Sequence, residues 1–163
     1  IAHAGWRGLA ASLPMRMVAA FRHTYQSRAD ELRVALGPAI RACCYEVGPH
    51  FNGRFAPFIR QHGERRLCDL VGMAVEQLRQ CGVPRSHIVD AQQCTACASE
   101  RWFSLRREGV STGRLTSFIM VSPSTSFRQA QGGEPVEPRP FDSLRSLRGV
   151  VSGVEPQVKR VEP

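Results

Sequence analysis

The strongest structural signal in this sequence is a helix-like segment that lies between two strand-like segments. Residues 67–81 carry apolar side chains at helical spacing along one face, namely Leu67, Leu70, Val71, Ala74 and Leu78. Gly82 and Pro84 predict the end of this helix, because glycine favours the position after a helix and proline cannot continue one. Residues 32–36 and 87–91 have the composition of strands. Strands that alternate with helices predict a layered α/β domain.

A second helix is predicted near the start of the chain. A turn at residues 5–8 leads into a helix that ends near Tyr25. Pro14 fits in the first turn of this helix if Ser12 is the N-cap, because proline lacks a backbone donor and is tolerated there. The remaining predicted elements are a strand end at residues 1–3, a short helix at 50–61, and strands at 102–107 and 115–121.

The sequence changes character after Val121. Residues 122–163 contain six of the 11 prolines, and the tripeptide Val-Glu-Pro occurs there three times. Such a segment has few large apolar residues with which to build a core. We therefore predict one domain over residues 1–121 and a disordered tail over residues 122–163, which resembles translated repetitive DNA.

The overall charge favours small anionic partners over nucleic acid. The chain has a formal charge of +8, and all but one of its 22 basic residues are arginines. These arginines are dispersed and lack the interleaved aromatic residues of single-strand binders, whereas a positive surface field attracts anionic substrates. The longest apolar runs are shorter than the roughly 18 residues of a membrane span. We expect a soluble, cytoplasmic protein whose six cysteines are free thiols.

The first motif with chemical potential is AHAGWRG at residues 2–8. It places His3 at a strand end, followed by a turn flanked by Gly5 and Gly8. Glycine backbone lets a ligand approach closely, and the backbone amides together with Arg7 suit an anion such as phosphate. Taken alone, the spacing favours a purely structural turn, in which His3 is a satisfied polar residue and Trp6 a core aromatic residue.

Two further motifs contain cysteines. In residues 37–48 (GPAIRACCYEVG), Cys43 and Cys44 are adjacent, and neighbouring side chains of an extended chain point apart. A turn with one exposed and one buried thiol is therefore expected. Cys94 and Cys97 form a CxxC, which is found in structural zinc sites and in redox pairs. A complete zinc site would need a second closely spaced pair.

The last motif, FSLRREGVSTGR at residues 103–114, is rich in arginine. Arg106, Arg107 and Arg114 lie around a turn, and guanidinium groups bind phosphate oxygens well. The alternative is that these are solvated charges of a hairpin.

The order of these motifs closely resembles the laccase-domain, or YfiH-like, family over residues 1–121. Members of this family are described as polyphenol oxidases, as purine nucleoside phosphorylases with adenosine deaminase activity, and as peptidoglycan editing factors. The resemblance implies a layered α/β/β/α sandwich. The chain would hold only the C-terminal part of that fold, which agrees with its beginning at Ile1 in what reads as a strand end.

The resemblance also implies a metal site of two histidines and one cysteine. His3 corresponds to one of the histidines. The other two ligands belong to Q-V-H and T-A-D-C motifs that lie upstream in the family, and none of Cys43, Cys44 and Cys94 is expected to replace them. Zinc is the implied metal, although such a ligand set also accepts copper.

The function implied is that of a zinc-dependent purine nucleoside phosphorylase with adenosine deaminase and methylthioadenosine phosphorylase activity. Its partners would be purine nucleosides and phosphate, and the isolated chain would be inactive. We expect catalytic roles for His3, Arg7 and Arg114, and substrate binding by Arg106 and Cys44. The alternatives are a copper polyphenol oxidase, an amidase that edits cell-wall precursors, and a non-enzymatic cysteine-rich metal-binding module.

Overall fold

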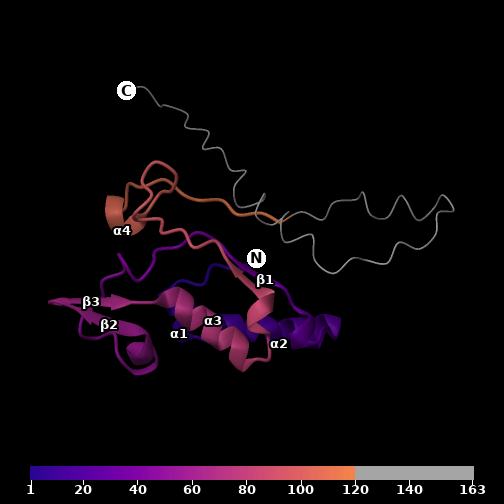
Figure 1. The fold of residues 1–163 in the computed structure, drawn as a ribbon. Helices are drawn as coiled ribbons and strands as arrows, with labels where there is room; N and C mark the ends of the chain where they lie inside the picture. Colours follow the sequence, from indigo (N-terminus) through magenta and orange to yellow (C-terminus); the bar gives the residue numbers. More distant parts are fainter. Residues whose placement is uncertain (120–163) are drawn as a thin grey trace, which may run out of the picture. The chain divides into compact units, whose positions relative to one another are not determined.

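The computed structural model describes residues 1–119 (Figure 1). Ala2–Leu115 form one compact unit, which the following paragraphs describe. The described residues of the second unit, Ile1 and Thr116–Ile119, contain no helix or strand. The predicted tail at 122–163 lies outside the described residues.

The compact unit is a mixed α/β structure. Its helices are α1 (Trp6–Ala10), α2 (Leu13–Tyr25), α3 (Leu70–Gln80) and α4 (Leu105–Glu108), with 3₁₀ helices η1 (Ala29–Glu31), η2 (Gly53–Phe58) and η3 (Arg85–His87). Its strands are β1 (Val34–Leu36), β2 (Ile59–His62), β3 (Arg65–Cys68) and β4 (Ile88–Asp90). They form two small sheets, β1 with β4 and β2 with β3.

Strands β1 and β4 confirm the strands predicted at 32–36 and 87–91. They run parallel, with Val34 opposite Ile88 and Leu36 opposite Asp90. A parallel pair needs a long crossover, and this one contains α3. The pairing continues beyond the strand ends as an isolated parallel bridge between Ala39 and Cys94. The segments that follow both strands are therefore held side by side.

The hairpin of β2 and β3 was not predicted. In place of the short helix expected at 50–61, the structure has the 3₁₀ helix η2. The last residues of the expected range, 59–61, belong to β2. The helix expected at 67–81 begins at Leu70, because Leu67 and Cys68 pair in β3. Asp69 caps the helix, its carboxylate accepting a hydrogen bond of 2.8 Å from the Gly72 amide.

The helix expected up to Tyr25 is interrupted between α1 and α2. Ser12 has a left-handed conformation with φ of 57°, which no continuous helix permits. Pro14 lies in the first turn of α2, as predicted. Ser12 precedes the helix but makes no side-chain cap. Its hydroxyl instead accepts a hydrogen bond of 3.2 Å from Arg54.

The prediction of a strand at 102–107 is wrong. The chain is irregular before Leu105 and then forms the single helical turn α4. Arg107 explains the difference, because its guanidinium donates to the carbonyls of Thr95 and Trp102, at 2.7 and 2.8 Å. These bonds fold the segment back onto the CxxC turn, which leaves it unable to extend as a strand.

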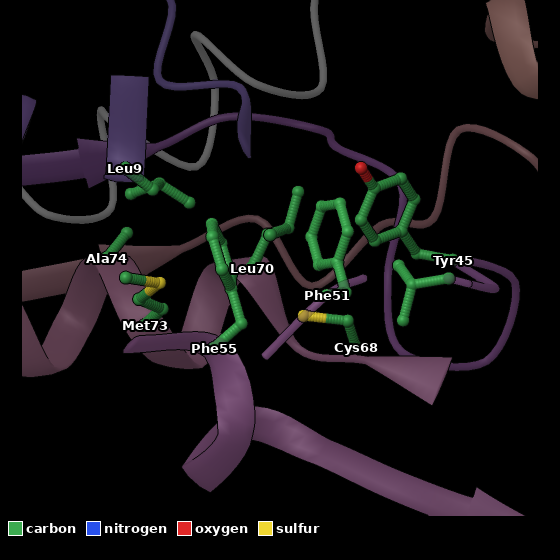
Figure 2. Close-up of a cluster of buried hydrophobic side chains, with 9 residues drawn as sticks. Leu9, Tyr45, Phe51, Phe55, Cys68, Leu70, Met73 and Ala74 are labelled. Atoms are coloured by element: carbon green, nitrogen blue, oxygen red, sulfur yellow. The ribbon is translucent and has the colours of Figure 1, made fainter. Parts of the chain in front are cut away.

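The core consists of two clusters of buried side chains. The larger one surrounds α3 and is shown in Figure 2; its members are Leu9, Tyr45, Val47, Phe51, Phe55, Cys68, Leu70, Met73 and Ala74. The smaller one contains Val18, Leu78, Val83 and Ile88 and lies beneath the β1–β4 pair. Helix α3 contributes to both clusters and packs against α1 and α2 (Figure 1). The predicted helix therefore organises the unit.

Neither β1 nor β4 has a second neighbouring strand among residues 1–119. A sheet of two strands is too small to form a complete layer. The structure is thus consistent with an incomplete layered α/β fold. Within the described residues, no helix has the length and apolar character needed to cross a bilayer.

We predict that Leu9→Ala lowers the free energy of unfolding by about 2–5 kcal/mol, because Leu9 is 1% exposed and its loss leaves a cavity. Leu105→Ala is the matched control, since Leu105 is 61% exposed and its truncation should change stability by less than about 0.5 kcal/mol. Urea denaturation followed by circular dichroism measures both. Equal effects of the two substitutions would contradict the assignment of Leu9 to the core.

Candidate functional site

His3 lies exposed at the start of the unit, where its imidazole folds over Gly5. A Cβ atom at Gly5 would lie 2.9 Å from His3 Nε2, closer than real contacts allow. Gly5 is also the residue that precedes α1, and its carbonyl accepts a hydrogen bond of 2.9 Å from the Leu9 amide. The glycine of this motif therefore gives the imidazole room to lie against the backbone. Gly8 in the same way leaves room for the Leu13 side chain, because a Cβ atom at Gly8 would lie 3.3 Å from Leu13 Cδ2.

Arg7 follows on α1 and is exposed. Its guanidinium lies over the Trp6 ring, 4.6 Å from the centroid. The Trp6 ring in turn contacts Phe51 of the larger core cluster at a centroid distance of 5.4 Å. Arg7 makes no ion pair with a carboxylate in the part of the chain that the structure describes. Its charge is held in place by an aromatic ring and faces solvent.

The other two predicted arginines have backbone partners. Arg106 lies over the Tyr45 ring at 4.9 Å and donates to the Glu46 carbonyl at 3.0 Å. Arg114 donates to the carbonyls of its own turn, Thr112 at 2.5 Å and Gly113 at 3.1 Å. Both side chains are exposed.

The contacts found among residues 1–119 do not gather these groups into one site. No hydrogen bond or ring contact of the described residues joins His3 to Arg7, Arg106 or Arg114. A hollow of the surface, with a volume of about 760 Å³, is lined by Ser12, Met15, Arg54, Pro57, Phe58, Met73, Glu76, Gln77 and Gln80. None of the predicted site residues lines it. The catalytic roles of His3, Arg7 and Arg114 thus remain predictions.

The structure does bring together four thiols that sequence reasoning left apart. The Sγ atoms of Cys43, Cys44, Cys94 and Cys97 lie within 4.8 Å of one another. Cys97 Sγ is 3.6 Å from Cys43 Sγ and 3.3 Å from Cys44 Sγ. All four are free thiols, of which Cys94 is buried and Cys43 and Cys97 are exposed. Cys44, predicted to bind substrate, is a member of this thiol cluster, and His3 is not.

The local backbone explains why adjacent cysteines converge. The amides of Cys44 and Tyr45 both donate to the Arg41 carbonyl at 2.9 Å, so residues 42–44 form the turn that was predicted. In a tight turn neighbouring side chains no longer alternate, and both thiols reach the same cluster. The expectation that the two side chains diverge was wrong for this reason.

The CxxC turn is held in a similar way. The Ala98 amide donates to the Cys94 carbonyl at 3.1 Å, and Arg107 donates to the carbonyls of Thr95 and Ala96 at 2.7 and 3.1 Å. The sequence feature that indicates this cluster is the position of each cysteine pair after a predicted strand. Each cysteine pair follows a strand by a few residues, and the two strands are parallel neighbours. The pairs therefore meet at the same edge of the sheet.

A two-armed ion pair links the two segments next to the cluster. Arg41 Nη1 and Nη2 donate to the Asp90 carboxylate at 2.7 and 2.6 Å, and both side chains are largely buried. The hydrogen bonds from Arg41 hold the pKa of the Asp90 carboxyl below its usual value despite burial, which raises it. Such planar pairs fix geometry as well as charge.

Comparison with solved structures assigns the fold. The chain matches the crystal structure of YlmD from Geobacillus stearothermophilus with a TM-score of 0.63 and 34% identity, over 69% of this chain and 45% of that one. It matches YfiH from Bacillus licheniformis with a TM-score of 0.60 and 29% identity, over 66% and 44%. The mixed α/β unit therefore has the fold of YlmD and YfiH proteins, in part.

Sequence comparison gives the family. Residues 1–122 match the family described as multi-copper polyphenol oxidoreductase laccase, and the chain belongs to this family. It is 35% identical to the purine nucleoside phosphorylase YlmD of Geobacillus stearothermophilus, over 73% of this chain and 47% of that protein. It is 36% identical to the purine nucleoside phosphorylase YfiH of Escherichia coli, over 74% and 49%. It is also 30% identical to adenosine deaminase RL5 of an unknown prokaryotic organism, over 73% and 48%. The chain spans about half the length of these relatives.

We predict that Gly5→Ala moves the His3 imidazole without unfolding the protein, because the clashing atom is the end of a mobile side chain. The His3 Cε1–H signal in a proton–carbon NMR spectrum should shift relative to the wild type. Gly37→Ala is the control, since a Cβ atom there would meet nothing within 4 Å. An unchanged His3 signal in Gly5→Ala would contradict the described ring position.

We predict that Asp90→Asn lowers stability by about 1–3 kcal/mol at neutral pH, because it removes the negative charge and one of the two oxygens that accept hydrogen bonds from Arg41. The pKa of Asp90 is lower in the folded state, so its contribution is present above the unfolded pKa and is lost as the pH falls below about 4. The difference in stability between wild type and Asp90→Asn should therefore shrink on acidification. Asp30→Asn, which breaks an exposed ion pair with Arg28, should change little at any pH.

Proposed function

We propose that this chain forms part of a purine nucleoside phosphorylase with adenosine deaminase and methylthioadenosine phosphorylase activity. The observation that carries the proposal is the structure of residues 2–8. There His3 lies against a glycine backbone, and one helical turn on, Arg7 faces solvent without an acidic partner among the described residues. The names of its relatives, purine nucleoside phosphorylase and adenosine deaminase, support the same chemistry.

His3 is the only residue of the described chain that matches a metal ligand implied by the family. An exposed imidazole is a suitable ligand for zinc, and Gly5 leaves it space to turn. However, the only group of three or more potential ligands within residues 1–119 is the thiol cluster, to which His3 does not belong. We propose that His3 completes a metal site with donors from outside residues 1–119. When bound, such a metal would supply Lewis-acid activation in an open coordination position.

Arg7 is proposed to bind the phosphate nucleophile. In phosphorolysis, a phosphate oxygen attacks the anomeric carbon of the ribose while the bond to the purine nitrogen breaks. The attacking group is an anion that must be held in line, and a guanidinium offers several donors to phosphate oxygens. The Trp6 ring limits the positions that the Arg7 side chain adopts, so less freedom is lost when phosphate binds. We propose that Arg106 and Arg114 act as further substrate or phosphate contacts. The substrate contact expected of Cys44 stays a prediction, and its thiol lies in the thiol cluster.

A second candidate is a copper polyphenol oxidase. The description of the matching family favours it, and imidazole ligands accept copper as readily as zinc. The two proposals differ in the resident metal and in whether oxygen is consumed. Metal analysis of the purified enzyme, together with oxygen uptake on a diphenol, separates them.

We predict that Arg7→Ala raises the KM for phosphate about tenfold or more, because it removes hydrogen bonds from a charged group to an anion. The assay follows purine release from inosine in the enzyme expressed with whatever sequence precedes Ile1 in its gene. Deamination of adenosine uses no phosphate, so its kcat and KM should change far less.

Arg16→Ala is the matched control, since Arg16 is an exposed arginine on the neighbouring helix α2. It should leave the KM for phosphate unchanged. A phosphate KM that is equal in Arg7→Ala and wild type would remove Arg7 from this role, and the absence of any phosphate-dependent purine release in the wild type would refute the phosphorylase proposal.

A further inference from the structure

We propose that Cys43, Cys44, Cys94 and Cys97 together bind one zinc ion in a structural site that joins the turns following β1 and β4. This site is separate from His3, and it does not rest on the phosphorylase proposal. All four donors come from the described chain, so the site is complete within it.

The distances fit a tetrahedral ion. A zinc–sulfur bond of about 2.3 Å in a tetrahedron places the ligand sulfurs about 3.8 Å apart. Cys97 Sγ lies 3.3 Å from Cys44 Sγ and 3.6 Å from Cys43 Sγ, and all four Sγ atoms lie within 4.8 Å of one another. Small side-chain rotations would equalise these distances. A cluster of several iron atoms would need more room between the sulfurs, so the geometry favours a single ion.

The donor set selects the metal. Four thiolates are soft ligands, and a tetrahedral arrangement of four sulfurs is typical of zinc. No histidine or carboxylate belongs to the group of potential ligands formed by the described residues, so a metal that prefers oxygen has no suitable donor. Because four protein ligands fill the coordination sphere, no position is open for water or substrate. The site would stabilise structure and would not take part in the reaction.

The surroundings of the thiols shift their pKa values in different directions. Burial raises the pKa of the Cys94 thiol, but hydrogen bonds from the backbone amides of Arg41, Cys97 and Ala96 outweigh burial and lower it to about 6. The thiols of Cys43 and Cys44 have raised pKa values, because of burial and of their contacts with Cys97 and Cys94. Zinc binding would release the protons of the four thiols, since the thiolate is the form of cysteine that ligates the ion.

The surrounding backbone holds the donors before any metal binds. The Ala39–Cys94 bridge aligns the two segments, and the pair of Arg41 with Asp90 ties them together at one end. Arg107 fixes the CxxC turn from the other side. A preorganised site loses little conformational entropy on binding. Zinc would in turn connect residues about 50 positions apart in sequence, which stabilises the folded state as a cross-link does.

The test uses the full 163-residue chain, purified under reducing conditions without chelator. Elemental analysis and native mass spectrometry should find one zinc per chain. Replacement by cobalt should give the absorption bands of tetrahedral cobalt bound to thiolates. Cys97→Ser and Cys43→Ser should each lower zinc affinity by roughly a hundredfold or more, since loss of even an outer-shell partner costs 10–100-fold.

Two variants serve as matched controls. Cys81→Ser removes a half-buried cysteine outside the cluster, and His3→Ala removes the proposed ligand of the other site. Both should retain one zinc with unchanged affinity. Loss of zinc in His3→Ala together with its retention in Cys97→Ser would overturn the proposal and would assign the metal to His3.

A measurement on the wild type covers the case in which the serine variants fail to fold. Alkylation with N-ethylmaleimide, mapped by peptide mass spectrometry, should slow at the exposed Cys43 and Cys97 when zinc is bound and stay unchanged at Cys81. Equal alkylation of Cys43 and Cys97 with and without zinc would overturn the proposal. So would a chain that carries iron, or one that contains a disulfide among these four cysteines and no zinc.

Discussion

The parallel pairing of β1 with β4 is the contact on which the rest of the unit depends. It brings two segments about 50 residues apart into register, and the crossover between them contains α3, the helix that both core clusters share. The ion pair of Arg41 with Asp90 stands at the end of this pairing and is largely shielded from water. Removing one member of such a pair leaves an uncompensated charge. The strand pairing and the ion pair therefore both hold the two segments together.

Two chemically different regions project from this framework. One is the His3–Arg7 turn, which is held by glycines and an aromatic ring and which we propose to bind the catalytic metal and phosphate. The other is the thiol cluster, which is complete within the described chain. The first needs further donors to become a metal site, whereas the second needs only the ion. The two proposals thus assign a metal to different places, a catalytic one at His3 and a structural one at the thiol cluster.

Some of the elements followed from local pattern. The periodic helix around Leu70 and the strands near Val34 and Ile88 were predicted because their apolar spacing reflects burial on one or two faces. The errors arose where hydrogen bonds between neighbouring segments override the helix or strand preference of each segment. Residues 65–68 have helix-compatible composition but pair with β2, and the segment before Leu105 is curled by Arg107. Such bonds depend on residues brought near by folding, which local propensity does not contain.

The sequence alone determined the family and the α/β class, because those depend on residue identity and on short-range spacing. Only the tertiary structure decided which thiols meet. Cys43 with Cys44 and Cys94 with Cys97 are ordinary short motifs when read separately, and the strand pairing together with a tight turn after Arg41 makes them one cluster. The physical reason is that convergence of side chains depends on strand register and turn geometry, which are settled by the whole core.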